Sequence, residues 1–199
     1  MAMRTEPLSA ASVRSPVERI EELRCRADPR ANRADVAGRY DELFRAGAVP
    51  DPRPDGFLPG ALEATTTFPA LDAYGRWVSR LWMPWAGKRF DAATETGANR
   101  LTPSARIPMR LFWPSHRPGA AEGGALEAFP FRTRIEPAAL DSGTDVLVID
   151  YDFEANPAFI IRRIRDELVQ VDDGFYLGKV LMRFASGYRR IGFFSLRRP

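Results

Sequence analysis

Two carboxylates and a phenol stand side by side at Asp150, Tyr151 and Asp152, and this triplet has the clearest capacity for acid–base chemistry. On an extended strand, the two aspartates point to one face and the tyrosine to the other. If the carboxylates face an enclosed interior, their pKa values can separate, so that one serves as acid and the other as base. Alternation favours the other arrangement, a polar outer face with arginine counter-charges. With Tyr176, these three residues are the candidate catalytic set.

Large aromatic side chains are numerous for a small domain and could line a binding cavity. Such a cavity would hold an apolar or aromatic small molecule, whereas the same rings could instead fill a solid core. Trp85 and Trp113 each stand beside an expected loop and are the best candidates for pocket walls. The complete candidate ligand-binding set is Trp85, Phe112, Trp113, Phe129, Phe131 and Tyr176.

Charged residues offer an alternative anchor for a ligand that carries a carboxylate, such as a fatty acid. Such a ligand needs one or two inward arginines. Alternation puts Arg132 and Arg134 opposite Phe131, so these arginines cannot share an interior with that ring. The wider set of inward candidates also includes Glu63 and Arg110.

The single histidine and the single cysteine exclude several classes of site. One cysteine forms no intrachain disulfide and no cysteine-rich zinc site. His116 could be an axial haem ligand in a barrel, but its setting between Pro114 and Pro118 is more typical of an exposed loop. No nucleophile elbow, phosphate-binding loop or dinucleotide fingerprint is present. The expectation is therefore no cofactor and no metal.

The charge pattern argues against a nucleic-acid partner. Of 29 basic residues only Lys88 and Lys179 are lysines, and the net charge is +3. The arginines are scattered among 26 acidic residues and form no basic stripe, unlike those of most nucleic-acid-binding modules. No apolar run is long enough to span a membrane, and the first residues do not resemble a signal peptide. A soluble, cytoplasmic protein is expected.

The first third of the chain has helical periodicity. Ser15 and Glu18 form a capping box for a helix expected over 16–27, and a second helix is expected over 32–46. Residues 50–60 are rich in proline and glycine and mark a boundary. We therefore expect a helical extension over 1–48 and a second domain over 49–199. The helical pair is a candidate lid, plug or homodimer contact.

After residue 85 the hydrophobic period changes to two, which predicts half-buried strands. Short turns such as Asp172-Asp173-Gly174 join the later ones. Together they indicate an antiparallel β-barrel with one or two short helices, one of them over 69–82. The expected strands cover 85–91, 107–113, 129–136, 147–153, 165–171, 175–184 and 188–197.

Three segments resemble the GXWXG-motif family of uncharacterised proteins. They are Gly56-Phe57-Leu58-Pro59-Gly60, with Leu58 at the position of the motif's tryptophan, Trp85-Ala86-Gly87-Lys88-Arg89-Phe90, and Phe193-Phe194-Ser195-Leu196-Arg197. The resemblance implies a calycin-like barrel, similar in shape to lipocalins, over residues 50–199. It implies no reaction.

The expected function is the binding of a small apolar or aromatic molecule in the lumen of this barrel. The alternative is a cofactor-independent isomerase, cyclase or hydratase that uses a carboxylate or tyrosine in the same lumen. A third reading is an interaction protein that uses the helical pair as its interface.

Overall fold

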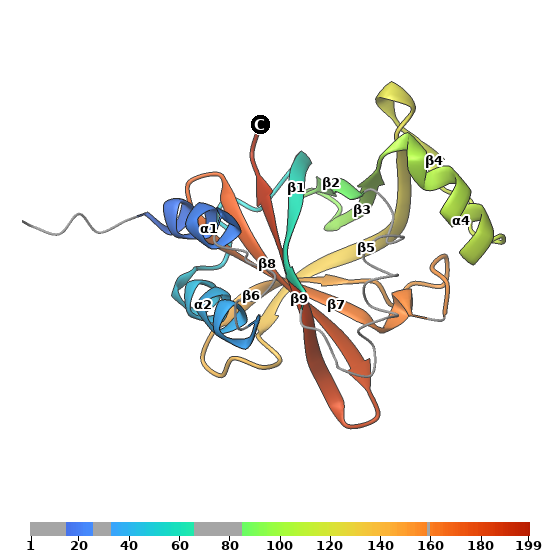
Figure 1. Ribbon diagram of the computed structural model, residues 1–199. Coiled ribbons are helices and arrows are strands. Elements are labelled where there is room, and N and C mark those ends of the chain that lie inside the picture. Colours follow the sequence, from blue (N-terminus) through green and yellow to red (C-terminus); the bar gives the residue numbers. More distant parts are fainter. Residues whose placement is uncertain (1–14, 26–32, 66–84, 159) are drawn as a thin grey trace, which may run out of the picture.

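The strands form one antiparallel sheet that closes on itself (Figure 1). A computed structural model describes residues 15–25, 33–65, 85–158 and 160–199. Within these ranges the sheet order is β3-β2-β1-β9-β8-β7-β6-β5, and β3 also pairs with β5 to complete an eight-strand barrel. The two-residue strand β4 is added to β5 outside the ring. The predicted fold class, a mainly antiparallel β-barrel with short helices, is confirmed.

The elements have the following bounds. The strands are β1 (Gly56–Thr65), β2 (Trp85–Asp91), β3 (Thr96–Leu101), β4 (Gly119–Ala120), β5 (Leu126–Pro137), β6 (Asp145–Asp150), β7 (Ile164–Asp172), β8 (Phe175–Phe184) and β9 (Gly187–Arg197). The helices are α1 (Pro16–Cys25), α2 (Arg33–Ala46) and α4 (Arg106–Phe112), with single 3-10 turns η2 (Pro103–Ala105), η3 (Glu122–Gly124) and η4 (Ile161–Arg163).

Alternate side chains of the strands build two separate apolar clusters, one on each face of the sheet. The lumenal cluster draws side chains from all eight barrel strands, including Leu58, Phe90, Leu147 and Phe194. The outer cluster draws only on β6 to β9 and on the helices α1 and α2. This alternation is the period-two pattern of the sequence, and it gives the barrel an apolar interior and one covered outer wall.

The helical pair packs against the outside of the barrel. The Ser15–Glu18 capping box forms as predicted, with Ser15 N–H donating to Glu18 and Glu18 N–H donating to Ser15 Oγ. Ile20 and Phe44 are both completely buried against strands of the outer wall. Figure 1 shows α1 and α2 beside the wall. The pair is therefore neither a plug nor a lid over the lumen.

The predicted strand over 107–113 is wrong, because this segment is the helix α4. Pro103 and Pro108 both lie near the start of helical turns, where the missing proline N–H is not required. Met109 is buried, whereas Ile107 and Leu111 are exposed. The alternation of apolar residues here was therefore a coincidence of composition and does not reflect one buried face.

Three smaller expectations are corrected or left open by the structure. The proline- and glycine-rich stretch 50–60 is not wholly a linker, because β1 begins at Gly56 inside it. The strand expected over 147–153 ends at Asp150. The helix expected over 69–82 lies outside the described residues.

Candidate functional site

Four polar residues from four parts of the barrel meet in the lumen. Lys88 comes from β2, Asn99 from β3 and Asp166 from β7, and Tyr151 directly follows β6. All four are buried, with exposed fractions of 8% or less. We call these four residues the lumenal polar cluster. Such a group in an apolar interior is costly unless every member finds a partner.

A bulge in β2 places Lys88 in the lumen beside Trp85. Residues three apart on a regular strand face opposite sides, but the β2–β3 register shifts between Trp85 and Gly87. Gly87 has a φ of 143°, and a Cβ atom there would lie 2.1 Å from the Leu58 carbonyl oxygen. Only glycine fits this backbone, and the extra residue turns both side chains inward.

The cluster is closed by direct hydrogen bonds. Lys88 Nζ donates to Asp166 Oδ2 at 2.9 Å, to Asn99 Oδ1 at 3.0 Å and to the Tyr151 hydroxyl. The Tyr151 hydroxyl donates to Asp166 Oδ2 at 3.0 Å and accepts from Asn99 Nδ2 at 3.2 Å. Trp85 Nε1 also donates to Asn99 Oδ1, at 3.0 Å. All three ammonium protons of Lys88 thus have acceptors.

Aromatic rings surround the ammonium group. Lys88 Nζ lies 4.9 Å from the ring centre of Phe194, 5.1 Å from Tyr151 and 5.5 Å from both Trp85 and Phe131. These distances are in the range of cation–π attraction. Trp85 packs edge-on against Phe194, and Phe131 edge-on against Tyr151. The cluster therefore has apolar, planar walls.

Burial shifts the proton equilibria of the cluster in opposite directions. Loss of hydration lowers the pKa of the Lys88 ammonium, and the neighbouring Asp166 carboxylate opposes that shift. Burial raises the pKa of Tyr151 well above its usual value, and the charge of Asp166 adds to the effect. Tyr151 therefore remains a neutral phenol that can donate a hydrogen bond at physiological pH.

One oxygen of the cluster lacks a partner. Asp166 Oδ1 is buried and accepts no hydrogen bond from any residue that the structure describes. Its sister oxygen Oδ2 accepts from both Lys88 and Tyr151. A buried carboxylate oxygen without a donor is unfavourable by about 1–3 kcal/mol or more. This oxygen could therefore accept a hydrogen bond from a donor outside the protein.

The structure separates the candidate catalytic residues. Tyr151 lies in the lumen, but Asp150 and Asp152 lie outside it. Asp150 Oδ2 accepts from Arg134 Nη1 at 2.7 Å, and Asp152 Oδ1 accepts from Arg162 Nε at 2.8 Å. Partial burial tends to raise the pKa of Asp150, but the backbone N–H of Asp152 and the Arg134 guanidinium outweigh it and keep that pKa low.

Tyr176, the fourth candidate, is buried at the other end of the lumen. It stands at the start of β8, whereas Tyr151 follows the end of β6, and these two strands run in the same direction. Its hydroxyl accepts a hydrogen bond from Arg198 Nη2 at 3.2 Å. The two phenols therefore do not belong to one site.

The candidate ligand-binding aromatics are also divided. Trp85 and Phe131 wall the polar cluster, and Phe129 is buried in the lumenal cluster. Trp113 is partly buried and packs edge-on against Phe129, with 5.3 Å between ring centres. Phe112 lies on α4, where 37% of it is exposed, so it does not line the lumen.

The arginine anchors considered for a carboxylate ligand do not face the lumen. Arg134 pairs with Glu136 and Asp150 on the outer face, and Arg132 lies over the Phe153 ring. Glu63 accepts hydrogen bonds from Arg24, Tyr40 and Ser195 under the helical pair. Arg110 is an exposed residue of α4.

His116 is occupied at both ring nitrogens, which argues against a haem ligand. Nδ1 lies 3.1 Å from the Ala155 carbonyl oxygen, and the Phe129 N–H donates to Nε2 over 3.4 Å. The imidazole also stacks on the Phe129 ring. Burial lowers the pKa of His116, so the ring is neutral and ties the loop after α4 to β5.

Sequence reasoning missed Lys88, Asn99 and Asp166. A signal for two of them exists. Lys88 is one of two lysines beside 27 arginines, and Asp166 interrupts the inward-facing series Ile164, Asp166 and Leu168 on β7. A charged residue at an inward position is the pattern that marks a buried polar site.

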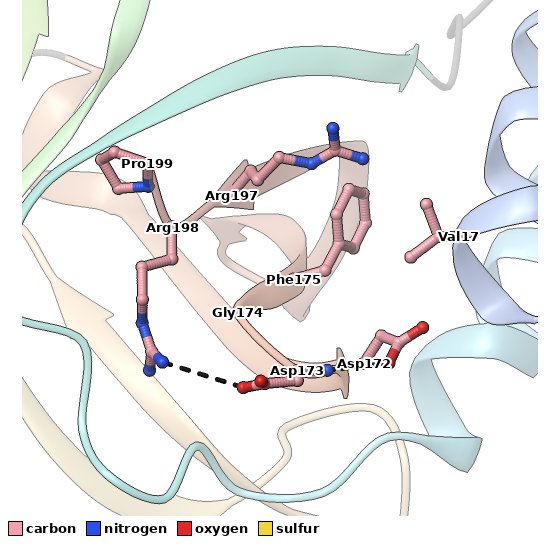
Figure 2. A pocket seen from close by; sticks show the side chains of 8 residues that line it. All are labelled: Val17, Asp172, Asp173, Gly174, Phe175, Arg197, Arg198 and Pro199. Carbon is pink, nitrogen blue, oxygen red and sulfur yellow. Dashed lines mark hydrogen bonds and ion pairs between the residues drawn. The ribbon is translucent and has the colours of Figure 1, made fainter.

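A surface hollow of about 410 Å³ lies at the opposite end of the barrel, between α1, the turn that joins β7 to β8, and the end of β9 (Figure 2). Arg198 Nη1 lies 3.7 Å from Asp173 Oδ1 across it. Arg197 lies over the Phe175 ring. The hollow has mixed, exposed charges and contains no buried polar atom without a partner among the residues described, so it points to no ligand class.

In the described part of the chain, no three His, Cys, Asp or Glu side chains come together in a way that suits a metal ion. None of the helices within the described ranges is long and apolar enough to cross a bilayer.

The chain is similar to a solved structure of a protein from Thermomonospora curvata. The TM-score is 0.53 and the sequence identity 22%, over 92% of this chain and 98% of that one. No family model matches the chain, and no curated protein matches it. The likeness is one of fold and assigns no activity.

Proposed function

We propose that the protein binds a small apolar or aromatic molecule in the barrel lumen, with the lumenal polar cluster as the anchor. The observation that carries this proposal is Asp166 Oδ1, a buried acceptor beside aromatic walls that has no donor among the described residues. A few polar groups in a mostly apolar enclosure are the usual composition of a small-molecule site.

The unpartnered oxygen Asp166 Oδ1 defines the chemistry of the ligand. Lys88 has already used its three protons on protein acceptors, so it offers little to an anion. A ligand carboxylate would also meet the charge of Asp166. A neutral hydroxyl or amino group that donates to Asp166 Oδ1 is favoured instead. A planar apolar body would then contact the rings of Trp85 and Phe131.

The polar cluster lies near one end of the barrel. Tyr151 follows the last residue of β6, Trp85 begins β2, and Asp166 is the third residue of β7. Trp85, Val180 and Met182 pack on the lumenal cluster but are only partly buried. Solvent therefore reaches side chains at this end, which is where a ligand would enter.

The alternative is a cofactor-independent enzyme in the same lumen. The observation in its favour is the hydrogen bond from the Tyr151 hydroxyl to Asp166, because such a pair can donate and accept a proton during an isomerisation or hydration. Its candidate carboxylate is Asp166, since Asp150 and Asp152 are on the outer face. Tyr151→Phe separates the two functions: a binder keeps most of its affinity, and an enzyme loses turnover.

Kinship with the GXWXG-motif family also remains a proposal. Its support is that the three motif segments lie on β1, β2 and β9, which are neighbours in the sheet.

The binding proposal is tested by calorimetric titration with 2-naphthol and 2-methoxynaphthalene. These probes share an aromatic body, but only 2-naphthol has a hydroxyl that can donate. We expect 2-naphthol to bind at least about tenfold more tightly, which corresponds to the loss of one charge-assisted hydrogen bond. Native mass spectrometry of the protein as purified would show whether a molecule of this class is already bound.

Two variants complete the titration. Asp166→Asn removes the anionic acceptor and should abolish the preference for 2-naphthol. Asp150→Asn makes the same chemical change on the outer face and should preserve it. Equal affinity of the native protein for both probes, or no binding of either, would overturn the proposal without depending on how a variant folds.

A further inference from the structure

The helix α4 exposes two apolar side chains side by side. Ile107 is 80% exposed and Leu111 70% exposed. They are four residues apart, so they lie next to each other on one face of the helix. Met109, on another face, is 2% exposed and fixes the helix to the lumenal cluster. The apolar pair is therefore held outward by an anchored helix.

The surroundings of this pair are positively charged. Arg106 and Arg110 are exposed residues of α4, and Arg117 is exposed in the loop that follows. Among the described residues, none of the three forms an ion pair, and Arg106 has only a long contact to the Gly124 carbonyl oxygen, at 3.5 Å. Residues 96–121 contain no Asp or Glu. The segment therefore presents uncompensated cations around two apolar side chains.

We propose that α4 docks the protein onto an anionic phospholipid surface. A short helix with apolar side chains and flanking arginines lies in the interface of a bilayer, with the apolar groups among the acyl chains and the guanidinium groups at the phosphates. Charge complementarity favours this occupant over a second copy of the chain. In a symmetric dimer through this face, the same arginines would oppose one another.

The position of α4 fits the docking proposal, which does not depend on the lumenal ligand proposed above. The helix follows the end of β3, on the side of the barrel away from α1 and α2 (Figure 1). Trp113, directly after it, packs on Phe129 in the lumen. Docking would thus bring the end of the barrel that contains the polar cluster close to the lipid surface.

The test is co-sedimentation of the full chain with lipid vesicles. One set contains phosphatidylcholine alone, and the other contains phosphatidylcholine mixed with phosphatidylglycerol. We expect binding only to the anionic vesicles, and we expect it to weaken as salt is added, because salt screens exposed charges. Two inserted side chains give a weak and reversible association.

Paired variants locate the contact. Ile107→Ser with Leu111→Ser should weaken binding by at least roughly a hundredfold, because two apolar side chains no longer insert. Its control is Leu140→Ser, another exposed leucine. Arg106→Gln with Arg110→Gln should weaken binding roughly thirtyfold. Its control, Arg39→Gln with Arg89→Gln, makes the same change in net charge elsewhere and should have little effect.

Several results would overturn the proposal. They are equal binding to both vesicle sets, no binding to the anionic set, and binding that the α4 variants leave unchanged. A shift from dimer to monomer in the serine variant, without vesicle binding of the native chain, would assign the face to a second copy. The native chain alone decides the first two results, and 2-naphthol binding is measured separately.

Discussion

The ion pair between Lys88 and Asp166 stabilises both buried charges in the lumen. Removal of one partner leaves the other charge buried and uncompensated. We expect Lys88→Met to lower the free energy of unfolding by about 3–5 kcal/mol.

Urea denaturation of Lys88→Met, Asp166→Asn and the double variant measures the coupling energy between Lys88 and Asp166. The double variant should be more stable than the sum of the single effects predicts by about 0.5–3 kcal/mol. Strict additivity would mean that the pair does not interact.

His116 makes the stability of the folded protein depend on pH. Burial lowers the pKa of this histidine in the folded state, so protonation favours the unfolded chain. Its contribution to stability is complete above the unfolded pKa of about 6.5 and is lost as the pH falls through the lower folded pKa. Protonated Nε2 can no longer accept from the Phe129 N–H.

The comparison variant for this response is His116→Gln, which does not titrate. Denaturation of both proteins from about pH 8 to about pH 5 should show a steeper loss of stability in the native chain. Because His116 is the single histidine, its imidazole resonances report its pKa directly. A measured value above that of an unfolded histidine would contradict the prediction.

At the scale of single elements, the bulge at Gly87 decides whether the site forms. Gly87→Ala places a Cβ 2.1 Å from the Leu58 carbonyl oxygen at a φ of 143°. We expect a loss of more than about 2 kcal/mol in stability and weaker binding of 2-naphthol. Gly38→Ala, in α2 with no atom within 4 Å of the added methyl, should instead stabilise by about 0.4–1 kcal/mol. Thermal unfolding distinguishes the two; equal effects would remove the special role of Gly87.

Local patterns predicted α1, α2 and six of the strands, β2 and β5 to β9, but they did not predict β1, β3 or the helix α4. The β7–β8–β9 meander and the capped α1 helix follow from alternation, turn residues and a capping box, all of which are local. The helix α4 was missed because Met109 is its one buried hydrophobic residue, so a seven-residue stretch carries no helical stripe. The bulge at Gly87 was missed because it depends on contact with Leu58, which is distant in sequence.

Only part of the candidate site could be predicted, because the sequence shows residue types but not the register of the strands. Trp85, Phe131 and Tyr151 are aromatic, and inward aromatic residues are visible in the sequence. Lys88 and Asp166 look like ordinary surface charges until the register of β2 and β7 is known. Their meeting depends on barrel closure through β3 and β5, which no local pattern encodes.

At the scale of the whole molecule, the helical pair packs on the outer wall and contributes no residue to the lumenal cluster. Phe44 of α2 is completely buried against that wall. We expect Phe44→Ala to lower the free energy of unfolding by about 3–5 kcal/mol. Affinity for 2-naphthol should remain close to that of the native protein under conditions where the variant is folded. Leu140→Ala, at an exposed position, should change stability by less than about 0.5 kcal/mol. A large loss of affinity in Phe44→Ala would show that the helices help to form the binding site.

The most direct test of the binding account is a crystal structure of the protein soaked with 2-naphthol. The account predicts electron density for the ring system in the lumen beside Trp85 and Phe131, with its hydroxyl oxygen within hydrogen-bonding distance of Asp166 Oδ1. A lumen filled by side chains, with an ordered water as the sole partner of Asp166 Oδ1, would contradict it. The cluster would then be a structural part of a solid barrel.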